Sequence, residues 1–86
     1  MKIIRLDRRF RVYQEANFTW AMTWPKTSDN FSIVCRMEEL MTDLFGDQYE
    51  QPYYINGWRS TFGGRYFYIY VRERPMLTAV LLAAAA

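Results

Sequence analysis

The most constraining feature of this sequence is the spacing of its apolar residues between positions 28 and 46. They recur three and four positions apart, as the buried stripe of an α-helix requires: Ile33, Val34, Met37, Leu40, Met41, Leu44 and Phe45. Ser28 or Asp29 can cap the amino end of this helix, and Gly46 can close it in the left-handed conformation. Because an apolar stripe must be buried, we expect a second layer of structure to pack against it.

The residues before this helix alternate between apolar and polar with a period of two, which is typical of half-buried strands. We expect strands over residues 3–13 and 17–24 that pair as a hairpin. Pro25 ends the second strand because proline lacks the N–H that a sheet ladder needs.

Two further strands are expected after the helix, over residues 53–62 and 65–74, and Gly63-Gly64 predicts a hairpin between them. Pro75 favours the start of a final helix. Its apolar stripe is expected to complete the core rather than enter a groove on a partner: Met76, Leu77, Val80 and Leu81. We therefore predict a single α+β domain over residues 1–86. A four-stranded antiparallel sheet in ββαββα order is covered on one face by two helices, the second short and carboxy-terminal.

The charge of the chain is nearly balanced, with 11 basic and 9 acidic residues and a net charge of +2. This balance is far from the strongly basic composition of a typical nucleic-acid binder. The charges are separated along the chain, however, because five basic residues fall within the first eleven positions and the acidic residues concentrate in the middle. We expect a molecule with one basic region and one acidic region.

The sequence lacks the residues that most enzyme sites use. It contains no histidine, and therefore no Ser-His or Cys-His nucleophilic pair. The one cysteine, Cys35, allows no intramolecular disulfide and is expected to be structural. Glu39 and Asp43 are four residues apart on a helix surface, and no metal-binding or phosphate-binding spacing accompanies them. We expect no enzyme activity, no cofactor and no metal.

The location of the protein is predicted from two negative observations. No signal peptide is seen at the amino terminus, because Arg5 and Asp7 interrupt the apolar residues. The longest apolar run, over residues 76–86, is shorter than the about 20 residues that span a bilayer. We expect a cytoplasmic protein with no membrane contact.

The candidate binding surface is a sheet face that is rich in tyrosine and arginine. Alternation places the tyrosines of residues 65–74 on one side, and the arginines of residues 3–13 on the polar side of their strand. The predicted partner-binding residues are Arg9, Arg11, Tyr66, Tyr68, Tyr70 and Arg72. Tyrosine and arginine are enriched at protein interfaces. Three alternatives remain open: a purely stabilising role in the sheet, a platform for single-stranded nucleic acid, and a homodimer contact.

The functional prediction is a small non-enzymatic protein-binding module that masks a site on a larger partner. Phage-encoded inhibitors of host machinery are examples of such accessory proteins. The acidic helix surface is a second candidate if the partner is basic, as a nucleic-acid-handling complex would be: Glu38, Glu39 and Asp43. No motif in the sequence is specific enough to indicate a family.

Overall fold

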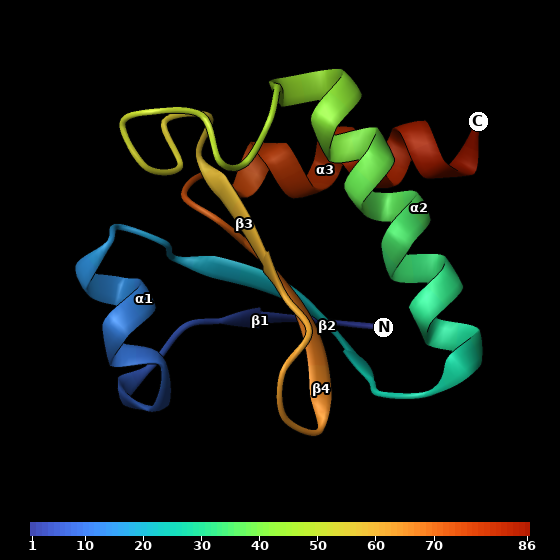
Figure 1. Ribbon diagram of the computed structural model, residues 1–86, viewed down its shortest axis with the longest axis horizontal. Helices are drawn as coiled ribbons and strands as arrows, with labels where there is room; N and C mark the ends of the chain where they lie inside the picture. The colour runs from blue at the N-terminus through green and yellow to red at the C-terminus, as the bar shows by residue number, and fades with distance from the viewer.

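Four antiparallel strands form one sheet in the order β1-β2-β4-β3, as the computed structural model of residues 1–86 shows (Figure 1). Their bounds are β1 (Lys2–Arg5), β2 (Trp20–Pro25), β3 (Trp58–Thr61) and β4 (Tyr66–Val71). The central pair is β2 with β4, and the edges are β1 and β3. The predicted α+β fold with a four-stranded antiparallel sheet is confirmed.

One face of the sheet is covered by the helices α2 (Ser28–Phe45) and α3 (Arg74–Ala85) (Figure 1). We call it the helix face. The main core lies there and combines side chains from three strands and both helices: Met22, Trp24, Val34, Met37, Met41, Trp58, Phe67, Ile69, Val71, Leu77 and Val80. The stripe of the last helix therefore completes the core, as expected. None of the helices is both long and apolar enough to cross a lipid bilayer.

The ends of α2 differ in detail from the prediction. Thr27, rather than Ser28 or Asp29, is the cap, because its side chain accepts a hydrogen bond from the backbone N–H of Asn30 at 3.1 Å. Gly46 ends the helix with φ 97° and ψ 177°, which is a positive φ but not the left-handed helical conformation. A Cβ at Gly46 would lie 2.7 Å from the side-chain nitrogen of Asn56, so the chain needs glycine here on two grounds.

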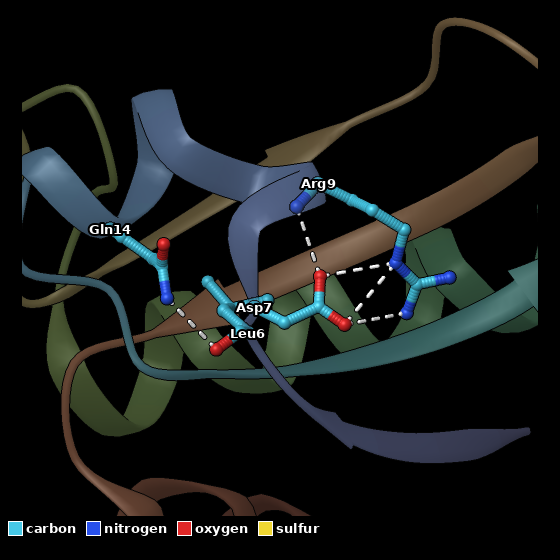
Figure 2. Close-up of polar contacts among 4 residues, drawn as sticks. All are labelled: Leu6, Asp7, Arg9 and Gln14. Atoms are coloured by element: carbon cyan, nitrogen blue, oxygen red, sulfur yellow. Dashed lines mark hydrogen bonds and ion pairs between the residues drawn. The ribbon is translucent and has the colours of Figure 1, made fainter.

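The predicted strand over residues 3–13 is wrong beyond Arg5, because the chain there becomes helical. A 3₁₀ turn, η1 (Arg8–Phe10), is followed by the short helix α1 (Arg11–Glu15). Asp7 starts the turn by accepting a hydrogen bond from the backbone N–H of Arg9 at 3.0 Å (Figure 2). This local bond between side chain and backbone competes with strand pairing, which is why the alternation alone was misleading.

The helical segment η1–α1 covers the face of the sheet opposite α2 and α3 (Figure 1), so the prediction of cover on one face only is wrong. Phe10 and Tyr13 are three residues apart, which places both rings on the sheet side of this segment. The Gln14 side-chain amide donates to the Leu6 carbonyl at 3.0 Å and ties the segment back to the chain after β1 (Figure 2). A second, smaller core therefore forms on this side, around Leu6, Phe18, Ala21 and Tyr70.

Both predicted strand pairs occur, with shorter strands. β1 pairs with β2 from Lys2↔Thr23 to Arg5↔Trp20, although η1 and α1 join them instead of a tight turn. β3 pairs with β4 through the predicted glycine turn, in which Gly64 takes φ 77° and Gly63 does not have a positive φ.

Candidate functional site

The tyrosines of β4 lie on the sheet face opposite the main core, which we call the tyrosine face. Their side chains become progressively more buried along the strand, from Tyr66 to Tyr70. Tyr70 is 2% exposed, Tyr68 is half-buried and Tyr66 is 46% exposed. The prediction that these three residues share one face is therefore confirmed, but only one end of that face is open.

The closed end of the tyrosine face is covered by α1 and by the loop after α2. The Tyr13 ring stacks on Tyr70 with centroids 4.0 Å apart and planes 12° apart. Phe10 meets Tyr68 and Tyr70 edge-on, at 5.5 and 6.2 Å between ring centroids. Burial raises the pKa of Tyr70 above its usual value, because an apolar environment disfavours the phenolate. Tyr70 offers no surface to a partner in this conformation.

Arg72 is also used within the fold. Its guanidinium donates to the backbone carbonyls of Ala16 at 3.2 Å and Tyr54 at 2.7 Å, and it lies 5.0 Å from the centre of the Phe18 ring. These contacts tie the end of α1 to the loop after α2. Two of the five N–H donors of this guanidinium are therefore used within the fold.

The two predicted arginines of the first strand are exposed, but they lie on the helical segment. Arg9 pairs with Asp7 at 3.0 Å, and Arg11 pairs with Glu15 at 3.1 Å. Hydrogen bonds from Arg9 hold the pKa of the Asp7 carboxyl below its usual value (Figure 2). Arg9 lies against Phe10, at 5.5 Å from its ring centre, and Phe10 contacts Tyr68, so Arg9 belongs to the border of the tyrosine face. Arg11 instead lines a different depression with Arg8 and Gln14.

The open end of the tyrosine face contains a groove that the sequence did not reveal. Its volume is about 380 Å³, and we call it the Tyr66 groove; its lining is Met1, Lys2, Thr23, Pro25 and Tyr66. Thr23 is 9% exposed, and its hydroxyl is the one buried side-chain oxygen or nitrogen of the chain with no hydrogen-bond partner. Buried polar atoms are nearly always paired, so this hydroxyl requires an explanation.

The members of this groove come together only through strand pairing. Lys2 lies opposite Thr23 in the register of β1 and β2, and Pro25 lies opposite Tyr66 in that of β2 and β4. No sequence motif connects them. The alternation of β2 did place Thr23 on the side away from Met22 and Trp24, which is the only signal that was available.

The second candidate surface lies on α2, where Glu39 and Asp43 are exposed and Glu38 is half-buried against the β3 side. Glu38 accepts hydrogen bonds from the Gln48 amide at 3.3 Å and from the Ser60 hydroxyl, whereas Glu39 lies 3.9 Å from Arg36. Glu38 and Glu39 line a groove of about 470 Å³ together with Asp43, Asp47 and Cys35. No three potential ligands among the acidic and cysteine side chains lie close enough together to hold a metal ion. The acidic surface and the basic segment η1–α1 are on opposite sides of the sheet (Figure 1).

Comparison with protein-family models, with curated proteins and with solved structures finds no match to this chain. Its function is therefore inferred from its own geometry.

Proposed function

We propose that this protein is a non-enzymatic binding module that masks a site on a larger protein partner through the open end of the tyrosine face. The contact surface comprises Tyr66, Tyr68 and Arg9 together with the Tyr66 groove. Of the residues expected from the sequence, Tyr70 and Arg72 hold the surface in place from below, and Arg11 lies outside it. In this proposal the partner is a cytoplasmic protein, and the module acts as an inhibitor or accessory factor of the kind that phages encode.

The observation that carries the proposal is the unpartnered Thr23 hydroxyl beside an exposed tyrosine. A buried hydroxyl without a hydrogen bond costs about 1–3 kcal/mol, which a protein recovers when a partner supplies the bond. Thr23 lines a groove, so a polar group that enters the groove can supply it. Tyr66 adds a large, rigid ring at the rim, which is the kind of residue that dominates protein interfaces.

The alternative of single-stranded nucleic acid receives less support from the structure. Stacking platforms need several exposed rings in a row. Here Phe10 packs against the ring of Tyr68, and Tyr13 packs against the ring of Tyr70. Tyr66 is therefore the one tyrosine of β4 whose ring is open to a partner.

The test is a comparison of two exposed tyrosines. Partners captured with the wild-type protein are identified by mass spectrometry, and direct binding is then measured by calorimetry for Tyr66→Ser and Tyr53→Ser. Tyr53 is 71% exposed and lies in the loop before β3, so it is a matched control. We expect a loss of about tenfold or more in affinity for Tyr66→Ser, which corresponds to about 1.4 kcal/mol, and no change for Tyr53→Ser. Equal affinities, or salt-sensitive binding of oligonucleotides in place of a protein, would contradict the proposal.

A further inference from the structure

The two edges of the sheet differ in whether their outward-pointing backbone groups have hydrogen-bond partners. At the β3 edge the backbone N–H of Ser60 points away from β4, and it donates to the side-chain oxygen of Gln48 at 2.7 Å. Gln48 is 6% exposed, and its amide nitrogen donates to the Ser60 hydroxyl at 2.9 Å. A buried side chain therefore occupies the position of a neighbouring strand and closes this edge at Ser60.

The β1 edge has no such cover. The N–H of Leu6 donates to the carbonyl of Thr19 at 2.9 Å, which continues the pairing of β1 with β2. Because hydrogen-bonded positions alternate along a strand, the even-numbered residues of β1 face β2, and the backbone groups of Ile3 and Arg5 point outward. Ile3 is also 39% exposed, so an apolar side chain lies beside these free backbone groups.

The charges along this edge are not neutralised within the molecule. The three ion pairs of the chain involve neither Lys2 nor Arg5. On the helix face, the guanidinium of Arg5 lies 5.7 Å and that of Arg74 lies 4.6 Å from the centre of the Trp20 ring. One indole therefore holds two unpaired guanidinium groups, on the side of the sheet toward which the Arg5 side chain points.

We propose that the outer edge of β1 binds an extended acidic segment of the partner protein as a fifth strand, with a carboxylate opposite Arg5 held by Arg5 and Arg74. This inference rests on the proposed function and names the chemistry of the partner. The backbone of Ile3 and Arg5 supplies the strand hydrogen bonds, and cross-strand neighbours share a face of the sheet. In an antiparallel arrangement, an apolar residue two positions after the carboxylate lies opposite Ile3, and the next residue lies opposite Lys2.

The positive charge of the β1 edge favours an acidic segment over a second copy of the chain. Two antiparallel β1 strands joined edge to edge would place the Lys2 residues of both copies on one face and the Arg5 residues of both copies on the other face. Like charges that lie opposite one another on neighbouring strands are destabilising. The same charges that repel a second copy attract an acidic strand. The edge also lies beside the Tyr66 groove, because Lys2 belongs to both.

The test uses a synthetic peptide with blocked ends, Thr-Glu-Thr-Val-Glu-Thr, and its counterpart with both glutamates replaced by glutamine. Binding and the protection of individual backbone amides are followed by NMR at low ionic strength, up to several millimolar peptide. We expect the glutamate peptide to protect the amides of Ile3 and Arg5 and to bind about tenfold or more tightly than the glutamine peptide, because charge-assisted bonds are the stronger ones. Unprotected amides at Ile3 and Arg5 would overturn the proposal.

Two sets of variants separate the backbone contribution from the charge contribution. Ile3→Pro removes an outward N–H without removing a bond to β2, and Ile3→Val is its matched control. We expect Ile3→Pro to lose peptide binding and Ile3→Val to keep it, with the exchange of the Met22 and Ile69 amides verifying the fold. The double variant Arg5→Gln with Arg74→Gln keeps the backbone intact and should reduce the preference for glutamate to the part that Lys2 contributes. A glutamate preference that is unchanged in this variant contradicts the proposal.

The outcomes also distinguish this inference from the proposed function. A protein partner that depends on Tyr66 but is indifferent to Ile3→Pro would retain the function and eliminate the strand-addition mode. Self-association that disappears in Ile3→Pro would assign the edge to a second copy instead, and protection of the same amides by a single-stranded oligonucleotide would assign it to nucleic acid. Either result overturns the acidic-segment proposal.

Discussion

Tyr13 of α1 stacks almost parallel on Tyr70 of β4, with ring centroids 4.0 Å apart. The contact joins the short helix to the central strands. Tyr70 also stacks against Tyr68, at 5.4 Å between centroids, so the rings of Tyr13, Tyr70 and Tyr68 form a row that joins α1 to β4. This row decides which part of the tyrosine face is available to a partner.

Truncation of the two terminal tyrosines of β4 should have opposite consequences. Tyr70→Ala removes a ring that is 2% exposed, and we expect it to lower the free energy of unfolding by about 3–5 kcal/mol, as for other buried aromatic residues. Tyr66→Ala, at 46% exposure, should change it by about 0.5 kcal/mol or less. Urea unfolding measures both, and a comparable loss in the two variants would show that the ring row is not formed.

The pH dependence of stability should reveal the buried phenol. Burial raises the pKa of Tyr70 above its usual value of 10.0, so the folded state retains this proton when the unfolded state has begun to lose it. The unfolded state then binds fewer protons, and stability falls as the pH rises through and above 10, whereas below 10 the contribution is fully present. We expect Tyr70→Phe to reduce this alkaline loss in urea unfolding series at several pH values. An unchanged slope in the variant would argue against a buried phenol.

The unpartnered hydroxyl of Thr23 can be tested against a paired one. Thr23→Val removes a hydroxyl with no partner, and we expect the free energy of unfolding to stay constant or to rise by about 1 kcal/mol. Thr19→Val is the matched control on the same strand side, because the Thr19 hydroxyl donates to the Arg72 carbonyl at 2.7 Å. That variant should lose about 0.5–1.5 kcal/mol. Partner binding should weaken in Thr23→Val but not in Thr19→Val. If binding weakens in neither variant, the Thr23 hydroxyl is not part of the proposed contact surface.

Opening of the β3 edge should be visible as self-association. Gln48→Ala leaves the N–H of Ser60 without its partner, and we expect a loss of about 1–3 kcal/mol in the free energy of unfolding. The exposed edge should also make the variant associate with increasing concentration, as light scattering can measure. Gln51→Ala, an exposed glutamine in the same loop, is the control and should remain unaffected. A Gln48→Ala variant that stays monomeric would mean that the edge is protected by other means.

The pattern of the sequence alone predicted the parts of this protein that depend on local chemistry. The apolar stripe of α2, the glycine turn before β4 and the alternation of Tyr66, Tyr68 and Tyr70 follow from residue spacing, because the helix and strand periods act on neighbouring residues. The four-stranded antiparallel sheet follows from the same periods. The alternation of residues 3–13 failed because one carboxylate, Asp7, stabilises a helical turn that a period cannot indicate.

Only the tertiary structure decided what each face and edge of the sheet can do. Tyr70 and Tyr66 are equivalent in sequence pattern, yet the packing of η1–α1 buries one and leaves the other free. The Tyr66 groove joins residues from three strands, and the difference between the two edges depends on a glutamine twelve positions before Ser60. Such relationships depend on strand order and register. These are set by the burial of the whole core rather than by any local segment, so they became visible only in the folded chain.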